Sequence, residues 1–448
     1  MVIAISLFAA GSAMSGSATT SAVLLCGRII QGIGGAGIGL LTQIIISGLV
    51  SVRERSKYIS IIFVAFTIGT GLGPTVGGIL LQRASWRWTF FINIPIACVT
   101  IFMLCIFLPH PPHPSYLFKV KAMQLDFIGN LLLIASVTAM LIGLSYGGSR
   151  DSWSSAKVFI PIIFGFLELA VFGLFEASQY CTNPILPPHV LFCNRTTIVT
   201  LILSITQFMF SYWIIYFLPV YFQGVLLASP EQSGVFLLPT VLFSVPVSIL
   251  FGYLMTKVGR YQPIHISATG LLTLGLGLFT MLNSGSSLAE VVVLQCIAAG
   301  GFGILMTTVL PAVQGSLPEK DNAIATAAWG FLRAVGGIWG VGIPAAIFDN
   351  QFQKYLAIHV SNTQILDSLN GGSAYAHVSG SYINSLPLPL RDDVISTYVD
   401  ALKIVWAIAA GLSGISFLLC FLGKEIPMRM TNQAGNSDQE VATTCGTE

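Results

Sequence analysis

Apolar positions along this chain form long runs that short polar segments separate. Five of these runs carry no formal charge, and each is longer than the about 20 apolar residues that cross a bilayer as a helix. They cover residues 1–27, 29–52, 58–82, 88–118 and 127–149. Further apolar runs lie at residues 158–178, 197–222, 233–255, 264–283, 289–314, 323–347 and 401–422. The pattern therefore predicts twelve membrane spans.

These runs lack the alternation of barrel strands, and backbone groups in hydrocarbon must be paired within a helix or a closed barrel. The predicted fold is an all-α membrane protein, a helical bundle of about twelve transmembrane helices. Only 8% of the residues are charged, against about 25% in a soluble domain, and the mean hydropathy is +0.82. A net charge of +2 gives no basic surface for nucleic acid. The expected partners are the lipid bilayer and a small solute, and a monomer is expected.

Lys and Arg residues set the predicted orientation, because cytoplasmic segments carry an excess of them. With both termini inside, eleven fall in inner segments and seven in outer ones. The eight cysteines lie in spans, inner segments or the C-terminal tail, where no oxidising exterior would pair them, so no disulfide is expected. The first run is interpreted as a retained span and not a signal peptide, because it has no basic flank.

Three patterns imitate enzyme or metal sites. Residues 32–37 (GIGGAG) match the GxGxxG of dinucleotide-binding turns, but no strand precedes them, and glycines inside apolar spans usually mark close helix packing. Residues 143–147 (GLSYG) match GxSxG, yet they close a predicted span. Residues 110–113 (HPPH) form an extended linker more readily than a ligand set. No catalytic residue, metal ligand or cofactor is predicted, and the chain is not expected to be an enzyme.

Charged residues inside the predicted spans are rare. A translocon scale assigns about 2.5–3.5 kcal/mol to an Arg at mid-membrane, so Arg28 should face a polar interior and bond Gln31 or a solute, unless it extends to the nearby surface. Arg333 follows Trp329 by one turn, and a cation–π contact there could be purely structural. Glu168 is a protonatable candidate that could also be neutral and packed, or paired with another helix.

Small residues define one face of the third predicted span. Gly69, Gly73 and Gly77 recur at every fourth position, so they line one face and would let the backbone of a neighbouring helix approach closely. Pro74 removes one internal hydrogen bond. The helix is therefore interpreted as able to bend or rock, although a static contact is an equally good interpretation.

Three stretches together resemble motifs of one family. Residues 24–36 (LLCGRIIQGIGGA) resemble motif B of the major facilitator superfamily, and residues 69–78 (GTGLGPTVGG) resemble motif C, the antiporter signature. Residues 86–95 (WRWTFFINIP) resemble the segment that opens the next helix in the fourteen-spanner drug:proton antiporters common in fungal toxin efflux. Residues 252–260 (GYLMTKVGR) resemble the motif A loop more weakly, because Thr256 stands where that motif prefers Asp.

The resemblance implies roles for individual residues. Motif B implies proton coupling, motif C marks an antiporter, and the motif A-like loop implies an inner gate. The residues concerned are Arg28, Gln31 and Gly32 in motif B, Gly69, Gly73, Pro74, Gly77 and Gly78 in motif C, and Gly252, Lys257, Gly259 and Arg260 in the motif A-like loop. Positive-inside topology explains Lys257 and Arg260 equally well.

The resemblance also implies a domain organisation. Aligned by motif B, Met1 falls at the start of the family's third helix, so the first two spans and the first motif A are missing from this sequence. A shortened gene model, an alternative start and a degenerate copy are the alternatives. The expected parts are residues 1–108 (a four-span remnant of the N-terminal bundle), 109–126 (a cytoplasmic linker), 127–178 (two extra central spans), 179–196 (a cytoplasmic linker), 197–422 (a six-helix bundle with a long outer loop at 349–400) and 423–448 (a cytoplasmic tail).

The function implied by the resemblance is proton-coupled export of small amphipathic organic compounds by alternating access, in the plasma membrane or else the vacuolar membrane. A facilitator of the same fold for siderophores or basic amino acids is one alternative, since fold does not fix the substrate. A truncated, transport-inactive protein that acts as an interaction partner or sensor is another. Aromatic and polar residues on the interior spans could contact a flat solute, namely Gln207, Tyr212, Trp213, Tyr216 and Gln295.

Overall fold

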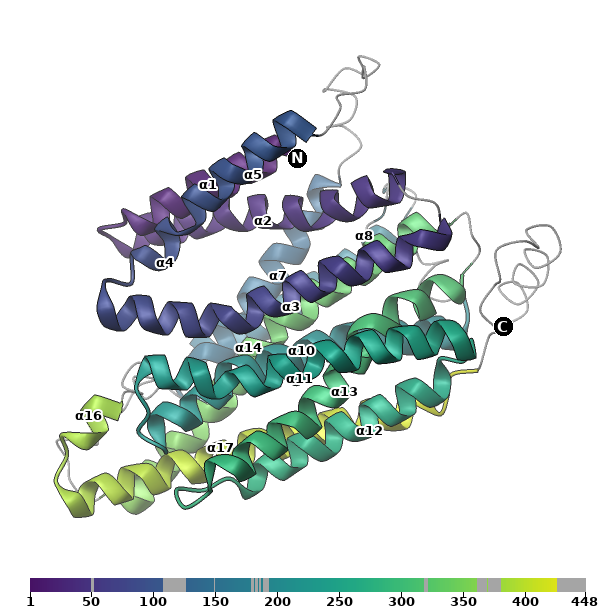
Figure 1. The fold of residues 1–448 in the computed structure, drawn as a ribbon. Helices are drawn as coiled ribbons and strands as arrows, with labels where there is room; N and C mark the ends of the chain where they lie inside the picture. Colours follow the sequence, from purple (N-terminus) through teal and green to yellow (C-terminus); the bar gives the residue numbers. More distant parts are fainter. Residues whose placement is uncertain are drawn as a thin grey trace. The chain divides into compact units, whose positions relative to one another are not determined.

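The described part of the chain folds into helices (Figure 1). In the described part of the chain every regular element is a helix, apart from one isolated bridge between Gly147 and Asp151. Eleven of these helices are long and apolar enough to cross a membrane, which confirms the all-α membrane fold. The computed structural model describes residues 1–49, 52–107, 126–148, 150–178, 181, 184, 187, 193–317, 321–360, 369 and 380–424.

The chain divides into two compact units. Unit 1 comprises Met1–Leu117 and Pro230–Leu238, and unit 2 comprises Phe118–Ser229 and Pro239–Glu448. Unit 1 contains α1 (Val2–Gly16), α2 (Ser21–Leu49), α3 (Val52–Arg83), α4 (Trp88–Phe91), α5 (Asn93–Phe107) and the first residues of α11 (Pro230–Val258).

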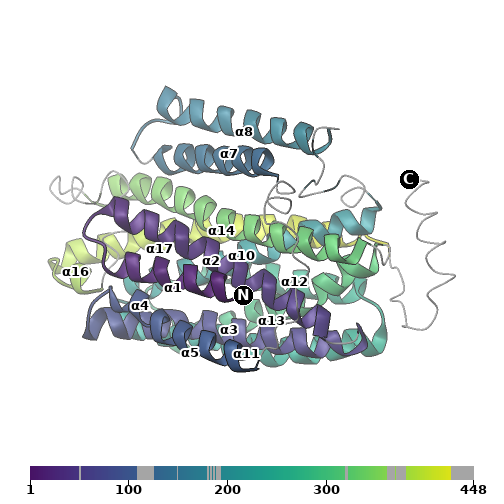
Figure 2. The ribbon, with the colours of Figure 1, turned by 90° about the horizontal axis from the view of Figure 1, so that it is seen from above.

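Unit 2 contains the other helices and the rest of α11. Within it, α7 and α8 form a hairpin whose two helices lie side by side, and α7 contacts α14 (Figure 2). Its helices are α7 (Phe127–Tyr146), α8 (Ala156–Glu176), α10 (Arg195–Gly224), α12 (Gln262–Leu278), the short 3₁₀ helix η1 (Phe279–Met281), α13 (Leu288–Gly315), α14 (Asn322–His359), α16 (Gly380–Asn384) and α17 (Leu388–Cys420). Most of the predicted segments 109–126, 179–196 and 423–448 lies outside the described residues.

The first predicted span, residues 1–27, is wrong in its extent. It is divided by a turn, so that α1 has only 15 residues and the segment from Ser21 onward belongs to α2. At 1.5 Å per residue α1 is about 22 Å long, less than the about 30 Å of a hydrocarbon core. Hydroxyl groups mark the turn: Ser17 Oγ donates to Ala13 O at 2.9 Å, and Thr20 Oγ1 accepts from Val23 N at 3.4 Å. The sequence prediction used only the absence of charged residues from 1–27, and this criterion cannot detect a turn formed by hydroxyl groups.

Small residues allow neighbouring helices to approach closely in both units. In unit 1 a Cβ added to Gly11 of α1 or Gly34 of α2 would meet the backbone of the other helix. In unit 2 the same holds for Gly165 between α7 and α8, and for Gly336 and Gly340 between α14 and α10. Helices in lipid gain little from the hydrophobic effect and associate largely through such close packing. These contacts fix the helices that carry the candidate site residues.

The predicted outer loop at 349–400 is shorter than expected at both ends. α14 continues to His359, and α17 begins at Leu388. The polar residues that suggested a loop are compatible with a helix that leaves the membrane, because the 38 residues of α14 span about 57 Å. Pro389 in the first turn of α17 suits a helix start, and His359 Nε2 lies 3.1 Å from Asp400 Oδ2 where the two helices meet.

The expectation that no disulfide forms is wrong for one residue. Cys193 is disulfide-bonded. The expectation was based on the redox compartment, which does not show which thiols the fold brings together. The free cysteines in the described part are Cys26, Cys98, Cys105, Cys181, Cys296 and Cys420.

Candidate functional site

The motif B arginine belongs to a chain of polar side chains in unit 1. Arg28 Nη1 donates to Gln31 Oε1 at 2.8 Å, and Gln31 Nε2 donates to Ser12 Oγ of α1 at 2.8 Å. Asn93 Nδ2 of α5 donates to the same hydroxyl at 3.4 Å. Gln31 is only 6% exposed, whereas Arg28 is exposed on the surface of the unit. The predicted bond between Arg28 and Gln31 is confirmed.

The hydrogen-bonded side chains around Arg28 bring two of the stretches that resemble family motifs together. Asn93 belongs to the 86–95 stretch, and Phe90 of the same stretch has its ring centroid 5.7 Å from the Arg28 guanidinium carbon. Ser12 lies outside every motif, and only its presence as a hydroxyl in an apolar helix could have suggested it. Gly32, in contrast, has no atom of the described chain within 4 Å of an added Cβ, so it is open in this unit.

The three regularly spaced glycines of motif C do not receive a neighbouring helix as predicted. Among the described residues, no atom lies within 4 Å of a Cβ added to Gly69, Gly73 or Gly77. At 3.6 residues per turn, the contact face of α3 lies on roughly the opposite side of the helix, where Thr75 and Gly78 lie. The regular spacing identified a face of α3, but a spacing alone does not show which face another helix covers.

The opposite face of α3 contacts the beginning of α11 within unit 1. Thr75 Oγ1 donates to Gly234 O at 2.9 Å, and a Cβ on Gly234 would meet the backbone of Pro74 and Thr75. Nearby, Arg83 Nη2 forms an ion pair with Glu231 Oε1 at 3.1 Å. The stretch that resembles motif C therefore forms a tight helix contact, through Pro74, Thr75 and Gly78 instead of its regularly spaced glycines.

The motif A-like loop lies at the end of α11. Gly259 follows the last helical residue with φ of +69°, and its N–H donates to Met255 O at 2.9 Å. This left-handed conformation suits glycine and closes the helix. Lys257 and Arg260 are exposed beside it, and Gly252 lies earlier in the helix near the Thr307 side chain. Helix termination alone explains Gly259.

The second intramembrane arginine lies in unit 2 against aromatic rings. The guanidinium carbon of Arg333 lies 4.9 Å from the Trp329 centroid and 4.5 Å from the Phe208 centroid of α10. Both rings are buried, and Arg333 is half-buried. The expected contact with Trp329 is confirmed. Phe208 was not predicted, because it comes from another helix.

The five residues suggested as solute contacts fall into two groups. Tyr212 and Tyr216 stack with their centroids 6.1 Å apart, and Tyr216 is 41% exposed. The other three are at most 1% exposed and are part of the packed interior. Gln207 Nε2 donates to Met306 Sδ at 3.5 Å, and Thr240 Oγ1 donates to Gln295 Oε1 at 2.8 Å. The buried group is Gln207, Trp213 and Gln295. In the described chain Gln207 Oε1, Trp213 Nε1 and Gln295 Nε2 have no hydrogen-bond partner.

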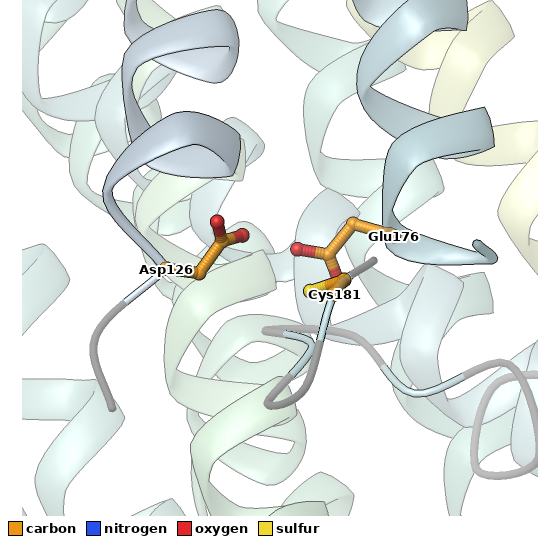
Figure 3. A group of neighbouring side chains, drawn as sticks. All are labelled: Asp126, Glu176 and Cys181. Atoms are coloured by element: carbon orange, nitrogen blue, oxygen red, sulfur yellow. The ribbon is translucent and has the colours of Figure 1, made fainter. Parts of the chain in front are cut away.

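Acidic residues lie at two places in the α7–α8 hairpin: Glu168 alone, and Asp126 with Glu176. Glu168 is half-buried on α8, and its Oε2 is buried without a hydrogen-bond partner in the described chain. At the start of α7 and the end of α8, Asp126 and Glu176 point toward one another beside Cys181 (Figure 3). Potential metal-ligating atoms of these three residues lie within 4.8 Å of one another. Asp126 already caps α7, since its Oδ1 accepts from Gly129 N at 2.8 Å, which is a sufficient structural role.

Comparisons with known proteins agree with these motifs. The MFS-type transporter gkaD of Penicillium citrinum is 41% identical over 432 residues, which cover 96% of this chain and 73% of that protein. The MFS-type efflux transporter pyiT of Pyricularia grisea is 40% identical and covers 98% of this chain and 72% of its own. The efflux pump FUS6 of Gibberella fujikuroi is 39% identical, with 96% and 77% covered.

Solved structures show the same fold at low identity. A bacterial homologue of the human lysosomal transporter Spinster, inward-facing and occupied, matches with a TM-score of 0.53 at 14% identity, covering 94% of this chain and 81% of that one. The peptide transporter POT matches with a TM-score of 0.53 at 16% identity, with 94% and 80% covered. The Major Facilitator Superfamily model matches residues 1–341. This chain, an integral multi-pass membrane protein, therefore belongs to the Major Facilitator Superfamily.

Proposed function

We propose that this protein is a drug:proton antiporter of the fourteen-spanner type, which exports small amphipathic organic compounds by alternating access. The fungal relatives named as efflux transporters and efflux pumps support export. The three resembling stretches support proton exchange and the subfamily. The proposed setting is the plasma membrane, and the proposed acting form is a monomer. One proton that enters across 100 mV supplies about 2.3 kcal/mol, and one pH unit supplies about 1.4 kcal/mol.

The observation that carries this proposal is the polar chain around Arg28. A guanidinium within an apolar helix is costly unless a polar group receives it, and here Gln31 does so. Gln31 is itself held by Ser12 of α1, to which Asn93 of α5 also donates. Arg28 remains exposed on its unit and can exchange Gln31 for another acceptor. This arrangement suits a group that changes partners during a transport cycle.

Unit 2 supplies the surface on which we propose that a flat solute packs. Tyr212 and Tyr216 stack on α10, and Tyr216 presents an exposed ring. Aromatic rings with polar tips offer large contact areas to an amphipathic compound and still allow hydrogen bonding. The closed packing of the other three suggested contacts leaves this pair as the preferred candidates.

Transport in reconstituted vesicles tests the proposal. The purified protein is placed in vesicles that contain a pH-sensitive dye, a pH gradient is imposed, and rhodamine 6G is added as the amphipathic probe. Wild-type protein should move probe and protons in opposite directions. Arg28→Ala should lower both fluxes at least about tenfold, because hydrogen bonds to a charged group are worth about 1.5–3 kcal/mol.

Cys26→Ala is the matched control, because Cys26 is exposed two residues earlier on the same helix. It should retain both fluxes. Probe flux that does not depend on the pH gradient would favour the alternative of a facilitator. Absence of flux in folded wild-type protein would favour the alternative of a transport-inactive protein. Arg28→Ala with wild-type fluxes would remove Arg28 from the mechanism.

A further inference from the structure

A pocket of about 470 Å³ opens between α7 and α14 in unit 2, and none of its lining residues belongs to the candidate site described above. Polar groups line one part of it and aliphatic side chains line another. The turn that follows α7 and one part of α14 form the polar side of the pocket. On the topology predicted from the sequence, this part of α14 is the outer one. The lining residues are Thr138, Leu141, Ile142, Ser145, Tyr146, Arg150 and Asp349.

Two opposite charges in this pocket lack a hydrogen-bonded partner in the described chain. Asp349 Oδ1 is buried and accepts no hydrogen bond from the described residues. Arg150 is exposed; its guanidinium carbon lies 5.3 Å from the centroid of the Tyr146 ring, and its charge also interacts electrostatically with Asp349. A buried carboxylate oxygen without a donor is unfavourable, so a ligand that brings a donor would be stabilised there.

The walls of the pocket are held in place by hydrogen bonds. Asn350 Nδ2 donates to Gly147 O at 2.8 Å, and Trp153 Nε1 donates to Asn350 Oδ1 at 2.9 Å. These bonds attach the α7–α8 turn to α14. Within the turn, Arg150 N donates to Tyr146 O at 3.1 Å, which fixes where the guanidinium begins. Both charges therefore line one pocket whose walls are held by hydrogen bonds, and a pre-formed site loses less free energy on binding than a flexible one.

We propose that this pocket binds a zwitterionic headgroup that combines a primary ammonium with a phosphate, as in an ethanolamine phospholipid. The ammonium supplies N–H donors to Asp349 Oδ1, and the guanidinium of Arg150 binds the phosphate. Leu141 and Ile142 lie about one turn before Tyr146 on α7, where they contact an acyl chain. Arg150 disfavours a simple organic cation, and Asp349 disfavours a simple anion.

Lipid retention on the full-length protein tests this proposal. Protein purified in mild detergent is titrated with phosphatidylethanolamine or with phosphatidylcholine of the same chains, and bound lipid is counted by native mass spectrometry. The wild type should prefer phosphatidylethanolamine, because a quaternary ammonium has no N–H to donate. Asp349→Asn and Arg150→Gln should each weaken phosphatidylethanolamine binding about tenfold.

Matched controls are Lys157→Gln, which removes an exposed cation near the same turn, and Asp392→Asn, which removes an exposed carboxylate on α17. Both should bind as the wild type does. Ile142→Trp fills the aliphatic wall without altering either charge and should also weaken binding. This variant tests the site independently, in case a charge variant loses binding only because it misfolds.

The source of the headgroup is settled by a competition arm. Glycerophosphoethanolamine, which has the headgroup without acyl chains, should displace the lipid only at much higher concentration. Equal potency would overturn the lipid assignment in favour of a soluble zwitterion. Equal binding of the two phospholipids, or unchanged binding by Asp349→Asn, would overturn the proposed site.

Discussion

Each compact unit holds an arginine within an apolar helix, and the two guanidinium groups are accommodated differently. In unit 1 Arg28 donates to Gln31, which in turn donates to Ser12. In unit 2 Arg333 lies against the rings of Phe208 and Trp329, at 4.5 and 4.9 Å from their centroids. The first arrangement relies on directional hydrogen bonds, and the second relies on the negative faces of aromatic rings.

The difference indicates how each unit should respond to change. A chain of hydrogen bonds fails when one member becomes apolar, because the neighbouring polar groups are then left without partners. A cation over aromatic rings needs mainly its charge and its contact with the rings. We therefore expect the site in unit 1 to depend on the polarity of its members, and the site in unit 2 to depend on the retention of a positive charge.

The largest effect is expected for Gln31→Leu. Gln31 is 6% exposed and bonds both Arg28 and Ser12, so leucine would remove an acceptor and a donor at once. Hydrogen bonds to charged groups contribute about 1.5–3 kcal/mol, so the initial rate of rhodamine 6G transport in vesicles should fall at least about tenfold.

Gln82→Leu is the control for this substitution. Gln82 is exposed near the end of α3, so the same change of side chain there should leave the transport rate close to the wild-type value. If Gln31→Leu also transports at the wild-type rate, the polar chain is a packing feature, and the contrast between the two units no longer has functional meaning.

The sequence predicted local parts of both arginine sites because helical spacing determines them. Residues three or four positions apart share a helix face, so Arg28 was expected near Gln31 and Arg333 near Trp329. Ser12 and Phe208 come from other helices, and local spacing contains no information about them. The helix contacts that complete each site were therefore found only in the structure.

Periodicity was also limited in predicting helix faces and helix ends. The spacing of Gly69, Gly73 and Gly77 correctly placed them on one face, yet the described chain covers the other face, at Thr75 and Gly78. The uncharged run 1–27 hid a turn, because hydroxyl groups that end a helix carry no charge. Composition identified the membrane fold, whereas pairing between helices depends on surface shape that composition does not encode.

An intermediate effect is expected at Arg333. Replacement by methionine keeps most of the length but removes the charge over the rings of Phe208 and Trp329. A cation–π contact is worth about 0.5–2 kcal/mol, so Arg333→Met should reduce transport about 2- to 30-fold. Arg333→Lys retains a cation and should keep most of the activity, as measured by concentration-dependent rhodamine 6G transport.

The lysine variant separates two explanations of this site. If Arg333→Lys is as impaired as Arg333→Met, the planar guanidinium itself is required, and a positive charge alone does not replace it. The site in unit 2 would then depend on directional bonding as the site in unit 1 does, and the comparison between them would have to be revised.

The smallest effect is expected for the exposed ion pair between α3 and the beginning of α11. Arg83 is 70% exposed and Glu231 is 29% exposed, and such pairs contribute about 0–1 kcal/mol. Glu231→Gln should therefore change the transport rate at most about fivefold at low salt, and less at high salt, where screening already weakens the pair.

Arg83→Gln and the double variant complete a cycle that isolates the pair from its surroundings. A coupling energy near zero is expected in high salt, because neither side chain is removed from water. A coupling as large as the effect of Gln31→Leu would instead mean that the contact between α3 and α11 forms or breaks during transport. In that case solvent exposure would not predict how strongly each charged contact of unit 1 affects transport. The effect of Arg28 could then no longer be distinguished from that of an ordinary surface charge.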